Sequence, residues 1–239
     1  MDTTARCNLR CRMCLVAYQE DRYNKKPPQI SDRLRGLPQV MSRELFLRIA
    51  EDVFPRTKTL YLSCGFEPLV NKEFDWILEQ TAPYRIPHLG FTTNGVLLGE
   101  EISRKCIETP VHEISVSLDG ACAETFESIR PGAKWDRVVG NLRRLVELRQ
   151  EADSELPRIR LNYVLMRRNI EEVVDFVDLA KNLGADVLDF RHVVVFDAAE
   201  EMREESLAGH KDLANAWLRR AKERADGIGL QVPYIPLFP

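Results

Sequence analysis

Three of the six cysteines lie within eight residues near the start of the chain, at Cys7, Cys11 and Cys14. Their spacing, Cys-x3-Cys-x2-Cys, brings three thiolates close enough together to hold an iron–sulfur cluster. A four-iron cluster usually takes four cysteine ligands. Three ligands would leave one iron open to a group that is not protein. The spacing therefore predicts a cluster site with a free coordination position, and we expect the function to lie there.

Two other uses of these cysteines stay open at this point. A structural zinc site could take the three thiolates and a histidine, although none of the four histidines is near them in the sequence. A non-catalytic iron–sulfur protein that only relays electrons would use the same ligands. Cys64, Cys106 and Cys122 are scattered without ligand spacing, and we expect them to be buried small residues and not ligands.

Composition limits the class of protein. A chain of 239 residues can bury one sizeable core, within the range of a single α/β barrel. The formal charge of −3 gives no electrostatic reason to expect nucleic acid or an anionic membrane as partner. No apolar run approaches the roughly 18 residues of a membrane span, and the chain start lacks a secretory segment. We expect a cytoplasmic protein whose clustered cysteines serve metal binding or catalysis.

Strand-like and helix-like segments alternate after the cysteines. Apolar runs predict strands at 59–63, 88–92, 113–118, 160–165 and 186–192, and a short strand is expected before the cysteines. Apolar residues at helical spacing predict helices around 45–53, 73–80, 102–107, 135–146, 173–180 and 207–221. Such alternation is typical of βαβ units and a parallel sheet. We predict an α/β fold, a partial TIM-like (β/α)6 barrel of parallel strands, formed by one domain over 1–239.

Local signals mark some element ends and some exceptions. Ser42 can cap the first helix, and Asn169 with Glu172 resembles a capping box. The long polar stretch at 19–41 is either a solvated insertion or a lid over the substrate. The apolar, proline-punctuated end at 230–239 indicates that the domain is cut short at its C-terminus, as it is at the first strand.

Polar and glycine-rich signatures follow successive strands. They are Gly65-Phe66-Glu67-Pro68, Thr92-Thr93-Asn94-Gly95 and Ser117-Leu118-Asp119-Gly120. In a parallel barrel the carboxyl ends of the strands share one face, where active sites are found. We therefore expect these loops to converge with the cysteines. A purely structural metal knot would need no such set of loops.

In these motifs the chain resembles the radical S-adenosylmethionine (SAM) superfamily. The cysteine spacing is that of the family's cluster motif, and Gly65-Phe66-Glu67-Pro68 resembles its Gly-Gly-Glu-Pro motif. Phe66 stands where the family usually has a second glycine. The later loops, with Ile129-Arg130-Pro131-Gly132, resemble the branch that often carries a cysteine-rich extension called SPASM. No cysteine follows Cys122, so such an extension would lie beyond Pro239.

The resemblance implies a chemistry. Cys7, Cys11 and Cys14 would ligate three irons of a [4Fe-4S] cluster, and S-adenosyl-L-methionine would chelate the fourth. One electron from a flavodoxin or ferredoxin type donor would cleave SAM to methionine and a 5′-deoxyadenosyl radical. That radical would remove hydrogen from a peptide or small-molecule substrate. The cofactor carries this chemistry, and the protein supplies binding and orientation.

The resemblance also implies SAM contacts. The residues concerned are Gly65, Glu67, Pro68 and Asn94 for the methionine end, Ser117 and Asp119 for the ribose, Arg130 for the carboxylate and Met13 beside the adenine. A turn-forming role is the alternative for the loop residues, simple packing for Met13, and an ordinary surface position for Arg130. Later in the chain, Asn162 and Leu165 would approach the adenine, and Arg191 and His192 the substrate, if the strand register turns them inward.

Overall fold

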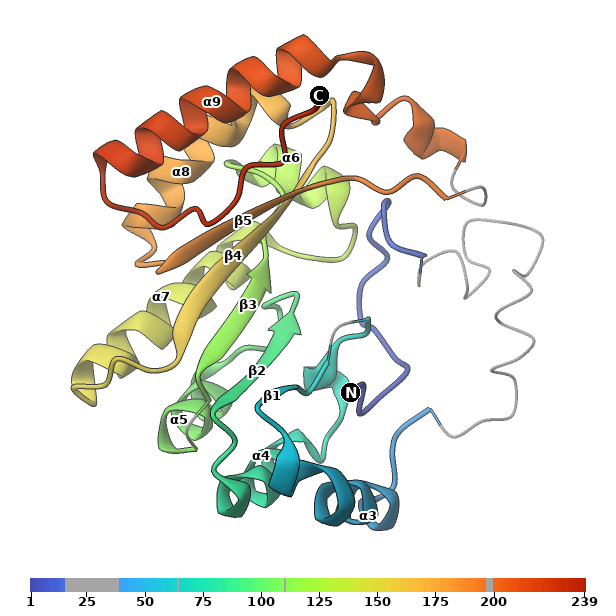
Figure 1. The fold of residues 1–239 in the computed structure, drawn as a ribbon, viewed down its shortest axis with the longest axis vertical. Coiled ribbons are helices and arrows are strands. Elements are labelled where there is room, and N and C mark those ends of the chain that lie inside the picture. The colour runs from blue at the N-terminus through green and yellow to red at the C-terminus, as the bar shows by residue number, and fades with distance from the viewer. Residues whose placement is uncertain (16–38, 64, 110, 197–199) are drawn as a thin grey trace. The chain divides into compact units, whose positions relative to one another are not determined.

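The structure is a computed structural model that describes residues 1–15, 39–63, 65–109, 111–196 and 200–239 (Figure 1). Cys64 and most of the polar stretch at 19–41 lie outside the described residues. The chain divides into two compact units. The first comprises Met1–Asn8, Leu37–Val116 and Arg137–Ile159, and the second Leu9–Gly36, Ser117–Asp136 and Arg160–Pro239. In the described part, no helix combines the length and apolar character needed to cross a membrane.

The first unit contains three parallel strands and their helices. The strands β1 (Thr59–Tyr61), β2 (His88–Thr93) and β3 (Glu113–Ser117) pair in sequence order, with Leu60 opposite Leu89 and Phe91 opposite Ile114. The helices are α3 (Arg43–Val53), α4 (Phe74–Thr81), α5 (Glu100–Glu108) and most of α7 (Trp135–Glu151), with short 3-10 helices at Phe54–Arg56, Pro68–Val70 and Ala82–Tyr84.

Helix α3 shows how local sequence sets these elements. Ser42 accepts a hydrogen bond from the Leu45 amide at 3.2 Å, as predicted for its cap, and so satisfies one free donor of the first turn. Phe46 is buried and its ring makes edge contacts with Phe54 and Trp76. The amphipathic pattern thus buries one face of the helix in the core of the first unit.

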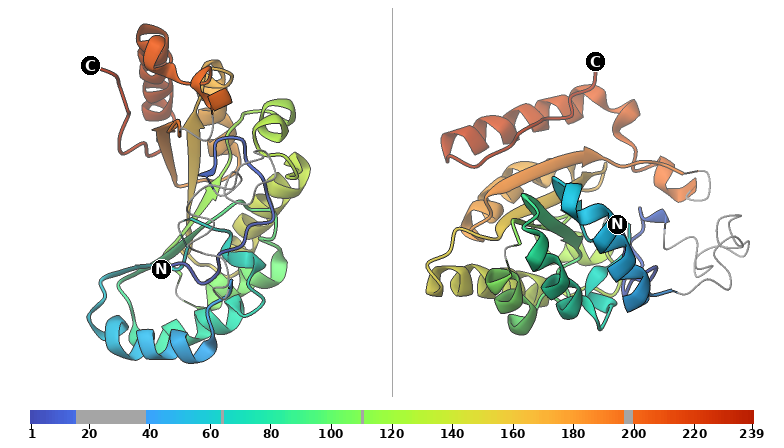
Figure 2. Two further views of the ribbon diagram at one scale, coloured as in Figure 1. Left: turned by 90° about the vertical axis from the view of Figure 1, so that its right-hand side faces the viewer. Right: turned by 60° about the horizontal axis from the view of Figure 1, so that its bottom comes forward.

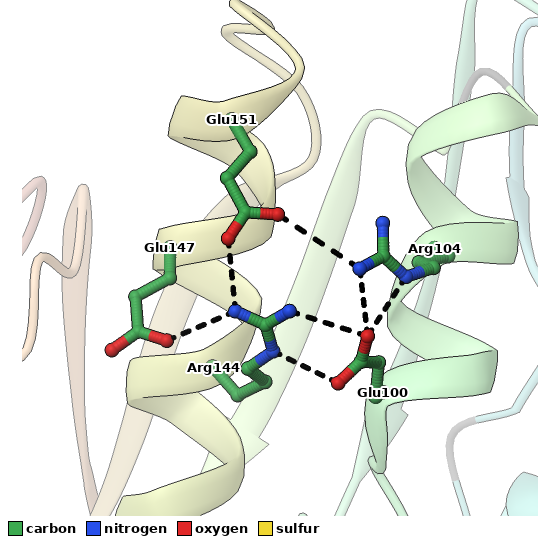
Figure 3. Close-up of polar contacts among 5 residues, drawn as sticks. All are labelled: Glu100, Arg104, Arg144, Glu147 and Glu151. Carbon is green, nitrogen blue, oxygen red and sulfur yellow. Dashed lines mark hydrogen bonds and ion pairs between the residues drawn. The ribbon is translucent and has the colours of Figure 1, made fainter.

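An ion-pair network on the surface of the first unit joins α5 to α7 (Figure 3). Arg144 contacts Glu100 at 3.0 Å, Glu147 at 3.2 Å and Glu151 at 3.0 Å, and Arg104 contacts Glu100 at 2.7 Å. Hydrogen bonds from Arg144 and then Arg104 lower the pKa of Glu100 to about 2. Single exposed ion pairs contribute little to stability. The main effect of this network is therefore to fix α5 against α7.

The second unit contains two parallel strands. Most of β4 (Arg158–Leu165) pairs with β5 (Val187–His192), and Tyr163 lies opposite Phe190. The helices are α6 (Ala123–Ile129), α8 (Val173–Asn182) and α9 (Lys211–Gly227), with 3-10 helices at Ile170–Glu172, Glu200–Arg203 and Leu207–Gly209. Helix α9 runs alongside α8 (Figures 1 and 2). Tyr163 and Phe190 pack against Phe176 of α8 in a buried aromatic core.

The last ten residues turn back after α9 and follow β5 in the same direction (Figure 1). The Leu188 amide donates to the Gln231 carbonyl at 2.8 Å, and the His192 ring donates to the Pro236 carbonyl at 2.6 Å. Among the described residues, the one bridge between tail and strand joins Val187 to Gln231, and the contact at Pro236 is a side-chain hydrogen bond. Pro233 and Pro236 have no amide hydrogen and therefore cannot donate to a ladder with β5.

The predicted α/β class with parallel strands is confirmed, and the described residues contain five strands. Where a short strand is expected before the cysteines, the structure has only an isolated bridge. There, Thr4 makes one antiparallel bridge with Val40, and the Met1 ammonium donates to the Tyr61 carbonyl at 2.7 Å. Leu207 was expected in the last helix but belongs to a separate short turn. Helix α6 was not predicted from the sequence.

Candidate functional site

Cys7, Cys11 and Cys14 are not joined in disulfides. Cys11 is buried, and the other two are half-buried. The Cys14 amide donates to the Cys11 carbonyl at 3.0 Å, so the chain turns between these two cysteines. Among the described residues, no three histidine, cysteine or acidic side chains are already gathered as a metal-holding group. The ligand set therefore stays a prediction from the motif.

The turn between Cys11 and Cys14 is anchored on the end of helix α6. The Arg12 amide donates to the Ile129 carbonyl at 3.0 Å, and its guanidinium donates to the Ser128 carbonyl at 2.8 Å. The last carbonyls of a helix have no partner within the helix. Arg12 satisfies two of them and thereby fixes the position of the cysteine turn within the second unit.

A buried ion pair lies beside Cys11. Arg130 donates to Asp119 Oδ2 from Nε at 2.7 Å and from Nη2 at 2.6 Å, and its Nη1 lies 3.5 Å from Cys11 Sγ. Asp119 is fully buried and Arg130 is 7% exposed. Asp119 Oδ1 also accepts from the Val164 amide at 2.8 Å. The predicted surface alternative for Arg130 is therefore wrong.

The charges of this pair depend on each other. Burial raises the pKa of Asp119, against the opposing effects of Arg130 and the Val164 amide. Burial alone would lower the pKa of Arg130, but Asp119 and then Cys11 outweigh it and raise that pKa. The guanidinium therefore stays charged next to the sulfur. A cation and an N–H donor at a cysteine sulfur suit an iron–sulfur cluster, whose thiolate ligands bring negative charge.

In the first unit, Glu67 braces the loops that follow β1 and β2. Its carboxylate accepts from the Leu69 amide at 3.2 Å, the Thr93 hydroxyl at 2.7 Å and the Asn94 amide at 2.7 Å. Its own amide donates at 3.1 Å to the carbonyl of Arg6, the residue directly before the first cysteine. Glu67 is 2% exposed. These contacts support the turn-forming role, and contact with the SAM amino group stays a prediction.

Asn94 connects the loop after β2 to the first cysteine. Its side-chain amide donates to Asn8 Oδ1 at 2.8 Å and lies 4.0 Å from Cys7 Sγ. Gly95 follows with φ of +76°, which a residue with a side chain rarely adopts. The Asn141 side chain on α7 donates to the Gly95 carbonyl at 2.8 Å. Sequence reasoning missed Asn141, because an amide that reaches a distant loop leaves no periodic signal.

Two other predicted contacts of the first unit have structural surroundings. The Gly65 amide donates to Asp2 Oδ1 at 3.1 Å, and a Cβ at Gly65 would meet Asp2 at an ordinary 3.7 Å. Space alone therefore does not require glycine at this position. Pro68 is buried and begins a 3-10 helix at the turn. Their contacts with SAM stay predictions.

In the second unit, Ser117 ends β3 with a half-buried side chain. Met13 packs against the buried cluster formed by Ile129, Met166 and Met202. This packing supports the simpler interpretation of Met13. A place beside the adenine stays a prediction, as does a ribose contact for Ser117.

Asn169 and Glu172 do not form the predicted capping box. The Asn169 side chain makes no cap hydrogen bond and instead donates to the Asp119 carbonyl at 3.0 Å and the Val164 carbonyl at 2.9 Å. Glu172 accepts from the Ala121 amide at 2.8 Å. Both side chains therefore hold the loop after β3, and long-range partners displace the local cap.

The strand register separates the residues expected near adenine and substrate. Asn162 lies opposite Asp189, and Leu165 lies opposite His192. Successive side chains of a strand point to opposite faces, so Arg191 and His192 cannot share one. His192 stacks on the Phe238 ring at 4.2 Å and donates to the tail. Its observed role is to hold the tail.

A parallel α/β fold that carries a Cys-x3-Cys-x2-Cys turn beside a buried guanidinium defines a class of cluster-binding α/β proteins. The sequence matches the Radical SAM superfamily over residues 1–180. The chain therefore belongs to the Radical SAM superfamily, whose members use a [4Fe-4S] cluster and SAM.

Similar proteins include the tungsten-containing aldehyde ferredoxin oxidoreductase cofactor-modifying protein of Pyrococcus furiosus. It is 25% identical over 243 residues, which cover 99% of this chain and 62% of that protein. The mycofactocin maturase MftC of Mycobacterium tuberculosis is 28% identical over 185 residues, covering 77% and 41%. The chain spans less than two thirds of the length of either relative.

Solved structures show the same fold. Streptococcus suis SuiB bound to S-adenosylmethionine has a TM-score of 0.67 at 17% identity, covering 96% of this chain and 48% of that chain. Native anSMEcpe with bound AdoMet has a TM-score of 0.66 at 15% identity, covering 97% and 62%. The fold of these radical SAM structures is a partial TIM barrel, in agreement with the predicted fold class.

Proposed function

We propose that this chain is the core of a radical SAM enzyme that acts on a peptide or small-molecule substrate. Cys7, Cys11 and Cys14 would hold a [4Fe-4S] cluster, and SAM would occupy the open iron. When bound, these groups supply a 5′-deoxyadenosyl radical after one-electron reduction, with methionine released, and that radical takes a hydrogen atom from the substrate. The observation that carries the proposal is the cysteine turn with the Arg130 guanidinium 3.5 Å from Cys11 Sγ.

The residues of the chain itself position and balance the site. Arg12 holds the cysteine turn on the end of α6, and Arg130 places a positive charge at the Cys11 sulfur. Asn94 brings an N–H group near Cys7, and Glu67 fixes the Asn94 backbone. Cysteines outside disulfides can serve as thiolate ligands, and these N–H donors suit the sulfur atoms that such ligands present.

Similar proteins support the proposed substrate class. SuiB has been solved bound to its precursor peptide SuiA, and a GTP 3′,8-cyclase of Arabidopsis thaliana is also similar to this chain. Both a peptide and a small molecule are therefore compatible with the superfamily. A low-potential flavodoxin or ferredoxin would supply the electron. Cysteine ligands must stay reduced, which favours the cytoplasm.

The test is anaerobic reconstitution with iron and sulfide, reduction with dithionite, and chromatography for 5′-deoxyadenosine after addition of SAM. We expect a brown protein with about four irons per chain that forms 5′-deoxyadenosine. Cys11→Ala should lose both the colour and the product. Cys122→Ala is the matched control, because Cys122 lies outside the motif and is exposed, unlike the buried position expected for it. A protein that loads iron but forms no 5′-deoxyadenosine would support the electron-relay alternative, and a colourless zinc protein would support the structural one.

A further inference from the structure

We propose that a cavity at the carboxyl ends of β4 and β5 binds an anionic group of the substrate, with Arg167 as the binding cation. This rests on the function proposed above and names the substrate class. The cavity has a volume of about 950 Å³. Its lining comes from three segments of the second unit, namely Arg167 and Arg168 after β4, Val195 after β5, and the loop that leads from Arg203 to His210 before α9.

Arg167 brings a positive charge that no carboxylate neutralises among the described residues. Its Nη1 lies 2.8 Å from His210 Nε2, and its backbone amide donates to the Glu205 carbonyl at 2.9 Å. Arginine has no acceptor atom, so the histidine nitrogen accepts this hydrogen bond. A guanidinium has five N–H donors, and the contact with His210 orients Arg167 while leaving donors for a ligand.

The other charges of the cavity nearly cancel. Arg168 forms an ion pair with Glu205, with Nε to Oε1 at 2.7 Å. Arg203 and Glu204 add one charge of each sign to the lining. The remaining charge is that of Arg167, so the cavity favours a single negative group over a highly charged polyanion.

The start of α9 follows the cavity-lining loop and carries Asp212 in its first turn. His210 is the N-cap residue of this 17-residue helix and makes no side-chain cap hydrogen bond. The first amides of a helix lack partners within it, and its N-terminus carries a partial positive charge. Since His210 also lines the cavity, the same loop contributes both a guanidinium partner and a helix start.

The cavity lies close to the cysteine turn within the second unit. Val195 lines it and also packs against the buried cluster of Ile129, Met166 and Met202. Met13, one of the two residues between Cys11 and Cys14 in sequence, packs against that same cluster. One apolar cluster therefore connects the cavity wall to the cysteine turn. Ligands of parallel α/β folds bind at the carboxyl ends of strands, and the volume lies within the roughly 300–1,000 Å³ of ligand sites.

The geometry of the cation defines the ligand chemistry. A guanidinium binds carboxylate and phosphate oxygens through paired N–H groups, and such charge-assisted hydrogen bonds are stronger than neutral ones. The expected ligand is therefore an oxyanion on the substrate. It is either a carboxylate, as on an acidic peptide residue, or a phosphate on a small molecule.

The test is titration calorimetry of the cluster-loaded protein without SAM, in two separate arms. One arm uses inorganic phosphate and the other acetyl-glutamyl amide. We expect one of the probes to bind, and the arm that binds identifies the oxyanion. The ring-nitrogen NMR signals of His210, one of four histidines in the chain, should shift as the probe that binds is added. Because SAM is absent, failure of anion binding and failure of SAM cleavage are separate results.

Variants decide whether Arg167 is the cation. Arg167→Ala should weaken binding about tenfold or more, because it removes charge-assisted hydrogen bonds, and Arg167→Lys should weaken it less. Arg167 is exposed, so the fold should tolerate both changes. The matched control is Arg224→Ala on α9, which removes an equal charge paired with Asp178 at 2.7 Å. The proposal is overturned if neither probe binds, or if Arg224→Ala weakens binding as much as Arg167→Ala.

Discussion

Replacing Asp119 by asparagine tests whether the buried ion pair supports the cysteine turn. The change keeps the shape of the side chain, and an amide oxygen can still accept from the Val164 amide, now at 2.8 Å. Arg130, which is 7% exposed, would lose its counter-charge. Removing one partner of a buried ion pair costs roughly 3–5 kcal/mol. We expect Asp119→Asn to cost about 3–5 kcal/mol, because the amide NH2 would face the Arg130 donors that Oδ2 now accepts, even if the Val164 contact survives.

The assay is urea unfolding of the cluster-loaded protein under anaerobic conditions, followed by far-ultraviolet circular dichroism. Arg130→Met should also be destabilised, because it leaves Asp119 buried without its guanidinium. The double variant should lose less than the sum of the two single losses, because it contains no unpaired buried charge. A loss below about 1 kcal/mol for Asp119→Asn, the value of an exposed pair, would refute the reasoning, as would losses that simply add.

Three further outcomes are expected in the first unit. Glu67→Gln should lower the free energy of unfolding by about 1–3 kcal/mol, since an amide cannot accept hydrogen bonds at both of its ends. Urea unfolding measures this loss, and unchanged stability would contradict the bracing role of Glu67. Gly90→Ala should cost about 1–3 kcal/mol because its Cβ would lie 2.8 Å from the Glu113 carbonyl oxygen, and a wild-type Tm would contradict that clash. Arg144 and a second arginine hold the pKa of Glu100 at about 2, below its ordinary 4.5, so its stabilising effect is present above pH 4.5 and disappears as pH falls towards 2. Stability of wild type and Glu100→Gln should therefore differ at pH 6 and converge near pH 2, and a gap independent of pH would exclude this role.

Elements with a local cause could be predicted from the sequence. Helix α3 has its Ser42 cap and apolar face, and Gly184 ends α8 with φ of +71°. Contacts between distant segments could not be predicted. Asn169 reaches the Asp119 carbonyl 50 residues earlier in the chain, although its sequence context indicated a cap. The tail's place beside β5 likewise depends on the fold, since its prolines argue against a strand.

The candidate site shows the same division. Cysteine spacing is a local property and predicts the ligands directly. The burial of Arg130 and its contact with Cys11 depend on a partner in another loop, so a surface arginine was an equal expectation. The motif around Glu67 indicates a residue that the structure buries and surrounds with hydrogen-bond donors. Its contacts, however, are with the Thr93 hydroxyl and the Asn94 amide, which the motif does not indicate.

Glu67 and Asp119 play parallel roles in their own units. Each is a buried carboxylate that accepts hydrogen bonds from a neighbouring segment. Glu67 accepts from Asn94, whose side chain lies near Cys7. Asp119 accepts from Arg130, whose guanidinium lies beside Cys11. Burying a carboxylate is costly unless its oxygens are satisfied, and both of these are. Cluster ligands must be held in place by their supporting contacts.

It follows that loss of activity alone cannot assign Glu67 to SAM binding. If Glu67 acts as a brace, Glu67→Gln should lower the iron content after reconstitution, because the loop that carries Asn94 near Cys7 loosens. If Glu67 instead binds the SAM amino group, the same variant should load iron normally and lose affinity for SAM, since a neutral amide attracts an ammonium less than a carboxylate does. Iron analysis and SAM titration on one preparation distinguish the two roles. The hydrogen bonds that the Glu67 carboxylate accepts from Leu69, Thr93 and Asn94 favour the first role.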